Sequence, residues 1–297
     1  MKYILRSLLF ALMVFISQLS FAQKKFAHPE RVRYDGSCMT IEGKDVFVYS
    51  AAFHYFRCPE ELWKDRFRQI KEAGFNTVET YVPWNWHERT MPLSLDDTTH
   101  FDFSDLKRWL KMAQDEYGFY TIVRPGPFIC AEYSGGGYPR WLAKYRPESV
   151  DDFWLRSADE RHIRWSQHWF DAVCKAVADE QITRKPVGDK GIILIQIENE
   201  YNHHGCDGKE KLLKALYSSV RKSGMDIPVF TCLTNECRSS RDPELSQVFD
   251  SDNYYVGLSS APDCAYRMSN LKKAQPDAPG FVTELQRMVL FGHGEVE

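Results

Sequence analysis

The chain has 297 residues, of which 43% are hydrophobic and 27% are charged, and its formal net charge is -3. This composition is typical of a globular protein and excludes an intrinsically disordered chain. No block of basic residues is present, so we predict no nucleic-acid partner.

The first 22 residues have the pattern of a secretory signal peptide, covering residues 1–22. A positively charged start is followed by a short apolar stretch over 8–16 and by small residues around 20–22. The apolar stretch is too short to cross a membrane, and no later run reaches spanning length, so we predict no membrane span. We expect the mature protein to begin near Gln23, to be secreted or periplasmic, and to form one domain over 23–297.

Strands and helices are predicted to alternate along the chain, which indicates parallel βα units. Helices are expected from Pro59 to Gly74, after a Ser104 cap, around residues 163–177, and around 212–220 with an end at Gly224. The sixth strand has the weakest pattern. The predicted strands cover residues 44–55, 76–82, 119–124, 192–197, 227–232, 247–255 and 281–284.

Two of these strands end in glutamates, Glu200 after the fourth strand and Glu284 at the seventh. They are 84 residues apart (284 − 200), and three βα units of a (β/α)8 barrel would span about 94 residues. We therefore expect an α/β fold of the (β/α)8 TIM-barrel class. Only thirteen residues follow Glu284 and no eighth strand is visible, so we expect a barrel that is incomplete at the C-terminus.

Two carboxylates at one barrel mouth are the groups that glycoside hydrolysis requires. In a retaining enzyme one is the nucleophile and the other a protonated acid, about 5–5.5 Å away. The structural alternative is that these glutamates cap helices or pair with arginines. Aromatic residues reach 14%, which suits a site where sugars stack on rings, although a tryptophan-rich core would account for part of this fraction.

The eight cysteines are an even number, and an oxidising compartment would allow them to pair. Their positions beside strand ends and on a helix face favour free, buried thiols for most of them. His203-His204 with Cys206 matches a metal cluster only weakly, and a solvated loop is the better interpretation. We predict no metal and no cofactor. The eight are Cys38, Cys58, Cys130, Cys174, Cys206, Cys232, Cys237 and Cys264.

Several long motifs, in matching order over residues 30–290, resemble glycoside hydrolase family 35. Known members are mainly exo-acting, retaining β-galactosidases with a (β/α)8 catalytic domain. The matching segments lie at residues 53–57, 63–66, 80–88, 124–132, 136–142 and 196–201.

The resemblance implies that Glu200 is the acid/base and Glu284 the nucleophile, whereas Glu198 has a structural role. It implies that Arg57 keeps the nucleophile ionised, although a surface salt bridge is the alternative. The positions that match the terminal galactose subsite are Tyr81, Cys130, Ala131, Glu132 and Asn199. For Tyr81 and Cys130, packing at the barrel mouth is the alternative.

The chain departs from the family pattern after Glu284, where Leu285-Gln286-Arg287-Met288 replaces the usual aromatics and Gly-Trp. This departure leaves the sugar open. The tyrosine that usually follows the sixth strand is either Tyr254 or Tyr255.

Three hypotheses follow. The first is a β-galactosidase that acts on glycans. The second is a retaining glycosidase for β-glucosaminides, β-glucosides or β-xylosides. The third is an inactive fragment or sugar-binding module. The expected partner in each case is carbohydrate, and the sequence indicates no oligomeric state.

Overall fold

Seven parallel strands form one curved sheet in the order β10-β9-β8-β7-β6-β5-β4. In this computed structural model, residues 26–145, 154–203, 208–234, 237, 242–255 and 262–286 are described. The predicted signal peptide, the segment 204–206 and residues 287–288 lie outside them. The strands are β4 (Ser50–Ala52), β5 (Thr77–Tyr81), β6 (Tyr120–Arg124), β7 (Ile192–Gln196), β8 (Val229–Cys232), β9 (Val248–Tyr255) and β10 (Val282–Gln286).

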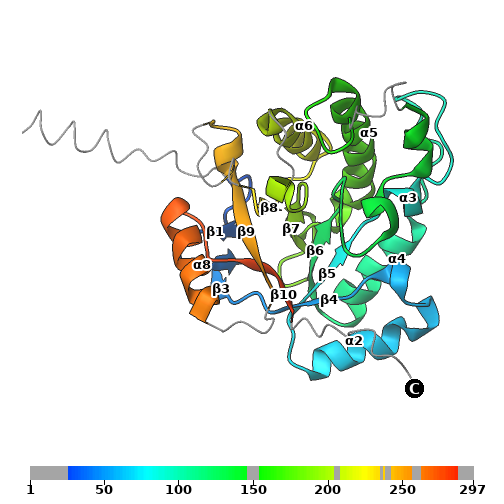
Figure 1. The fold of residues 1–297 in the computed structure, drawn as a ribbon. Coiled ribbons are helices and arrows are strands. Elements are labelled where there is room, and N and C mark those ends of the chain that lie inside the picture. Colours follow the sequence, from blue (N-terminus) through cyan, green and yellow to red (C-terminus); the bar gives the residue numbers. More distant parts are fainter. Residues whose placement is uncertain are drawn as a thin grey trace, which may run out of the picture.

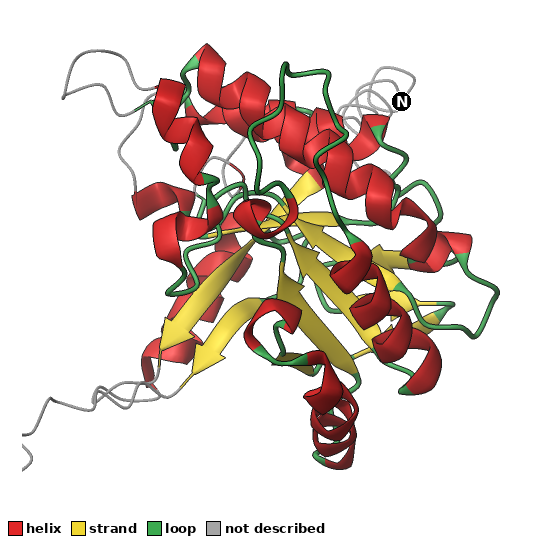
Figure 2. Ribbon diagram, turned by 90° about the vertical axis from the view of Figure 1, so that its right-hand side faces the viewer, coloured by secondary structure: helices red, strands yellow, loops and turns green. Residues whose placement is uncertain are grey.

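The sequential order and parallel pairing confirm the predicted barrel class. β4 and β10 are the two edges of the sheet. The sheet curves into an incomplete barrel whose two edges do not pair, and helices cover its outer side (Figures 1 and 2). Because parallel strands share one direction, their carboxyl ends meet at one rim. All five residues of β7 are buried, as the apolar run in the sequence predicts for a strand covered on both faces.

The segment predicted as one strand over 44–55 is two strands in different sheets, which corrects that prediction. β1 (Val32–Tyr34), β2 (Met39–Ile41) and β3 (Lys44–Val46) form a separate antiparallel sheet. Glu42 and Gly43, both with positive φ, form the β2–β3 turn. Lys44 and Asp45 are exposed and Phe47 is 82% exposed, so this part lacks the double-sided burial of a barrel strand.

The helices follow their strands as predicted, with three differences. The short helix α3 (Trp84–His87), directly after β5, was not predicted. The α4 helix begins at Ser104, and the carboxylate of Asp102 accepts from the Ser104 N–H, so Ser104 is not the cap. Helix α8 was not predicted because it has a weak apolar periodicity. The helices are α2 (Trp63–Glu72), α3 (Trp84–His87), α4 (Ser104–Lys111), α5 (Glu160–Val177), α6 (Lys209–Lys222) and α8 (Pro262–Ala274), which lies beside β9 (Figure 1).

The tryptophans belong to the core between sheet and helices. Trp84 stacks on Trp169 with ring centroids 5.8 Å apart, and seven of the eight tryptophan side chains are buried. None of the eight lines the cavity described below. The tryptophans therefore contribute to packing of the core and do not form a sugar platform in this cavity.

In the described part of the chain the predicted free state of the cysteines agrees with the structure, but the predicted burial holds for Cys174 and Cys232 and not for Cys38, Cys58, Cys130 and Cys264, which are partly exposed. Cys38, Cys58, Cys130, Cys174, Cys232 and Cys264 are free thiols. Within that part, no helix has the length and apolar character needed to cross a membrane.

Candidate active site

A cavity of about 1060 Å³ opens at the carboxyl ends of the strands and extends along the gap between β4 and β10. Both predicted catalytic glutamates face it. Part of its volume belongs to the gap between the sheet edges, so the cavity is larger than the site itself. The sequence-predicted residues that line it are Arg57, Tyr81, Cys130, Ala131, Glu132, Glu200 and Glu284.

Glu284 is held by three donors that converge on its carboxylate. The Arg124 guanidinium donates to Oε1 at 2.7 Å and the Tyr255 hydroxyl donates to Oε2 at 2.5 Å. The Tyr81 hydroxyl also donates to Oε1. Burial raises the pKa of Glu284, but the charge of Arg124 and the tyrosine hydrogen bonds outweigh it, so the pKa is below its ordinary value. Glu284 is therefore an ionised carboxylate of defined orientation, as a nucleophile must be.

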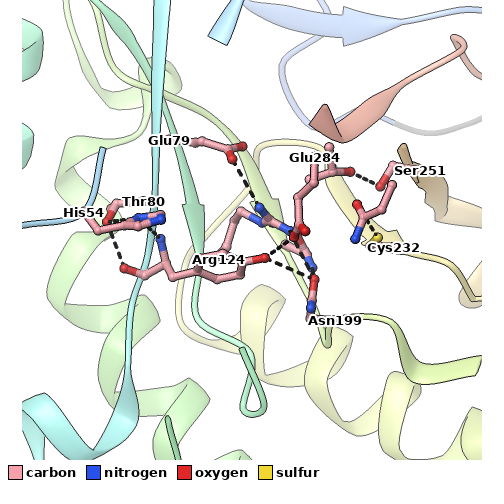
Figure 3. A network of polar contacts seen from close by, with 12 residues as sticks. His54, Glu79, Thr80, Arg124, Asn199, Cys232, Ser251 and Glu284 are labelled. Carbon is pink, nitrogen blue, oxygen red and sulfur yellow. Dashed lines mark hydrogen bonds and ion pairs between the residues drawn. The ribbon is translucent and has the colours of Figure 1, made fainter. Parts of the chain in front are cut away.

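Arg124, at the end of β6, connects Glu284 to the barrel interior and is fully buried (Figure 3). Its guanidinium also donates to Glu79 at 3.1 Å, to Gln196 at 2.5 Å and to the amide oxygen of Asn199 at 3.1 Å. A buried cation is tolerated when its charge is balanced and its N–H groups are satisfied. Arg124 meets both conditions.

The cation paired with the predicted nucleophile is Arg124, which corrects the prediction for Arg57. Arg57 is the exposed last residue of a short 3-10 helix (Tyr55–Arg57) after β4, and its guanidinium donates to the backbone carbonyl of Ala131. Arg124 is the last residue of β6, Arg57 comes after β4, and both line the cavity. Arg124 is the one that reaches Glu284, because its side chain is directed into the barrel.

Glu200 follows β7 in a left-handed conformation, with φ 51°, and Glu198 has φ 55°. These unusual dihedrals turn neighbouring side chains to different sides, as expected where a strained segment serves a site. The Glu200 carboxyl faces the cavity, and its Oε1 accepts from the Asn253 amide at 2.8 Å. Glu198 is buried and pairs with Arg156 at 3.2 Å, in keeping with its predicted structural role.

Arg156 binds the backbone of the segment that carries Glu200. Its Nη2 donates to the backbone carbonyl of Asn199 at 2.6 Å and to that of Glu200 at 3.3 Å. Its guanidinium lies over the Phe128 ring, 3.7 Å from the centroid. Gly136 allows this packing, because a Cβ there would lie 2.0 Å from the Phe128 ring. The strained segment 198–200 is therefore stabilised by Arg156, which is in direct contact with it although it lies more than forty residues earlier in the chain.

Replacing Arg156 with Met should lower the free energy of unfolding by about 3–5 kcal/mol, because buried Glu198 would lose its counter-charge. Urea unfolding measures this loss. The matched control is Arg161→Met: the Arg161 side chain is 42% exposed and pairs with Asp159, so its loss should cost less than about 1 kcal/mol. Equal losses in the two variants would contradict a special role for Arg156.

Cys130, Ala131 and Glu132 form a continuous left-handed segment of the cavity wall, with φ of 55°, 54° and 45°. Glu132 is exposed and lines the cavity. Burial and the nearby Glu200 raise the pKa of the Cys130 thiol.

Next to the first barrel strand, burial and the charges of Arg57 and Arg124 lower the pKa of His54 to about 3, so its imidazole is neutral.

Asn199 lies behind the cavity wall and is not one of its lining residues. Its amide oxygen accepts from Arg124 at 3.1 Å and from Gln196 at 3.0 Å. The contact of Asn199 with a sugar hydroxyl stays a prediction.

Of the two candidate tyrosines, Tyr255 faces the cavity and binds Glu284, whereas Tyr254 is buried beside Arg267.

Sequence reasoning missed Arg124, Glu79 and Asn253. The sequence does contain an indication of a functional role for Arg124: it is a charged residue at the end of a largely apolar strand, and it begins the family-like segment 124–132. The polar run around Asn253 made its strand look weak, yet residues 250–253 are at most 2% exposed. A polar run that folds as a buried strand indicates a functional site, because buried polar groups require partners.

Comparisons with known proteins identify the family and support the fold. The profile of glycosyl hydrolases family 35 matches residues 38–296. "Beta-galactosidase-1-like protein 3" of Rattus norvegicus is 38% identical over 182 residues, covering 60% of this chain and 26% of that protein. "Probable beta-galactosidase B" of Talaromyces marneffei is 30% identical over 286 residues, covering 86% of this chain and 27% of that protein.

A third relative has another name. "Exo-beta-D-glucosaminidase" of Pyrococcus horikoshii is 41% identical over 125 residues, covering 40% of this chain and 15% of that protein. The chain therefore spans roughly a quarter or less of the length of these three relatives.

Two solved structures share the fold at low sequence identity. The "GH2 beta-galacturonidase from Eisenbergiella tayi" has a TM-score of 0.53 at 16% identity, over 89% of this chain and 40% of that chain. An exo-beta-1,4-mannosidase of Opitutaceae bacterium strain TAV5 has a TM-score of 0.56 at 14% identity, over 83% and 46%. These likenesses support the barrel architecture alone. The family assignment rests on the profile match over residues 38–296, and by it this chain belongs to glycosyl hydrolases family 35.

Proposed function

We propose that the chain carries the catalytic site of a secreted, retaining exo-β-galactosidase. The observation that carries this proposal is the environment of Glu284. It is a carboxylate kept ionised by Arg124, oriented by two tyrosines and facing the same cavity as Glu200. Secretion rests on residues 1–22 and is checked by the amino terminus of the mature protein, expected near Gln23.

In this mechanism Glu284 attacks the anomeric carbon while Glu200 protonates the departing glycosidic oxygen. A covalent glycosyl-enzyme forms, and the aglycone leaves. Glu200, now a carboxylate, then removes a proton from water, which attacks the same carbon and releases the sugar with its configuration retained. Glu132 is suited to select the galactose hydroxyls, because a carboxylate accepts hydrogen bonds from two hydroxyls at once.

A β-glucosaminidase is the second candidate, favoured by the relatives named exo-beta-D-glucosaminidase at 41% and 42% identity. A panel of aryl β-glycosides assayed with the full-length protein separates the two. Hydrolysis of the glucosaminide in preference to the galactoside would reject the first candidate and leave the roles of the two glutamates unchanged.

Replacing Glu200 with Gln should lower kcat/KM for substrates with poor leaving groups by about 10²–10⁴-fold, because only those need protonation. For dinitrophenyl glycosides the loss should be far smaller. The alkaline limb of the kcat/KM profile, which reports loss of the acid's proton, should disappear. An intact alkaline limb in this variant would reject Glu200 as the acid.

A further inference from the structure

Two neighbouring strands supply a chain of hydrogen bonds that ends on Glu200. Cys232, on β8, donates its thiol proton to the amide oxygen of Asn253, with Sγ and Oδ1 3.0 Å apart. Asn253, on β9, donates from Nδ2 to Oε1 of Glu200 at 2.8 Å. Both side chains are buried, at 0% and 1% exposure. Figure 3 shows Cys232 at the edge of the Arg124–Glu284 network, near Ser251.

The direction of these bonds follows from the chemistry of the groups. An amide has one donor end and one acceptor end, and a thiol in this position acts as a donor. Burial raises the pKa of the Cys232 thiol well above its ordinary value, so the thiol keeps its proton. The thiol therefore holds the amide oxygen towards β8 and directs the amide N–H groups at Glu200. A flipped amide would lose both bonds.

We propose that Asn253, oriented by the thiol of Cys232, is a positioning residue for the acid/base: it occupies Oε1 of Glu200 and leaves Oε2 to carry the catalytic proton. A carboxylic acid holds its proton on one oxygen, and the oxygen that already accepts an N–H bond is the carbonyl-like one. The acid therefore presents its proton from a defined atom. The inference rests on the proposed role of Glu200 as acid/base.

Glu200 has ionisable neighbours on several elements. Cys130, Cys232 and Tyr255 interact with it electrostatically, and burial raises the pKa of each, so all three are neutral near pH 7. Arg156 binds the Glu200 backbone carbonyl. The Asn253 bond acts on the carboxyl itself. The charged groups lining the same cavity are Asp45, Arg57, Glu79, Arg124, Glu132 and Glu284.

Variants of Asn253 test the bond to Glu200. An N–H donor favours the ionised carboxylate, so Asn253→Ala should move the alkaline limb of the kcat/KM profile up by about 0.5–1 pH unit. Asn253→Asp has nearly the same shape but adds a negative charge beside Glu200, so its limb should move up by more than about 1 unit. An alkaline limb at the wild-type pH in both variants would overturn the proposal.

Variants of Cys232 test the orientation. Cys232→Val removes the donor and should move the alkaline limb in the same direction as Asn253→Ala. Cys232→Ser keeps a donor and should leave the limb in place. The matched control is Cys174→Val: Cys174 is a buried thiol on α5 that does not line the cavity, so this variant should lose stability without moving the limb. Equal limb positions for Cys232→Val and Cys232→Ser would contradict the orienting role.

The Glu200→Gln variant distinguishes a failure of the proposed mechanism from a failure of the proposed role of Asn253. If its alkaline limb persists, Glu200 is not the acid, and both the proposed mechanism and this inference are wrong. If the limb disappears while Asn253→Asp and Cys232→Val keep the wild-type limb, the mechanism stands and the inference alone is overturned. All profiles are measured on the full-length protein with one aryl β-galactoside, after thermal unfolding has shown that each variant is folded.

Discussion

Replacing Glu284 with Gln is expected to lower kcat on all substrates by about 10⁴–10⁶-fold, the scale on which loss of an essential nucleophile acts. The amide has nearly the same shape, so the fold should persist. The carboxylate that forms the covalent intermediate would be absent, and no leaving group could compensate for it. Steady-state kinetics on activated and unactivated galactosides measures the loss.

A mechanism-based fluorosugar should label Glu284 in the wild-type protein. Peptide mapping by mass spectrometry identifies the modified residue, and the Glu284→Gln variant is the unlabelled control. Exogenous azide should restore turnover in a Glu284→Gly variant by taking the place of the missing carboxylate. Label on Glu198 or Glu200 would reject the assignment of the nucleophile.

The second large effect is expected for Arg124→Met, which would leave the buried Glu79 and the partly buried Glu284 without their shared cation. Removing one partner of a buried ion pair costs about 3–5 kcal/mol of unfolding free energy. The exposed control Arg68→Met, whose side chain is 53% exposed and pairs with Glu72, should cost less than about 1 kcal/mol. Chemical unfolding of both variants measures the difference.

The same change should alter the pH profile. In the wild-type protein Arg124 and the tyrosines hold the pKa of Glu284 below its ordinary value, so the proposed activity is expected to extend into acid below the usual glutamate range. Without the cation, burial dominates, the pKa rises and the acid limb of kcat/KM moves to higher pH. The double variant Arg124→Met/Glu79→Gln should recover stability but not the acid limb. An unmoved acid limb in Arg124→Met would show that Arg124 does not control the ionisation of Glu284.

Arg57 and Arg124 show where interpretation of the sequence reached its limit. Both follow barrel strands and both occur in motifs similar to the family. Which of them pairs with Glu284 depends on the reach and direction of side chains from strands far apart in the chain. The buried Arg124 side chain extends through the barrel interior and forms an ion pair with Glu284, whereas the exposed Arg57 donates to the backbone carbonyl of Ala131.

Local pattern alone determined much of the fold. The apolar run of β7 predicts a strand buried on both faces, and its abrupt end predicts the place of Glu200. Such signals are local because burial and alternation are properties of a few consecutive residues. For the same reason the segment 44–55 was wrongly taken as one strand: it is apolar in part, but its first half pairs with β2 instead of the barrel.

What the sequence by itself determined is therefore the barrel class, the position of Glu200 after the carboxyl end of β7, and the resemblance to the family. Glu284 is predicted at the end of its strand, but it lies in the middle of β10, which continues to Gln286. Tertiary structure alone decided which side chains surround these two glutamates. Register places Glu284 opposite Asn253 and Cys232 opposite Ser251 on neighbouring strands. Lateral pairing of parallel strands brings together residues tens of positions apart, and no local pattern records which of their side chains share hydrogen bonds.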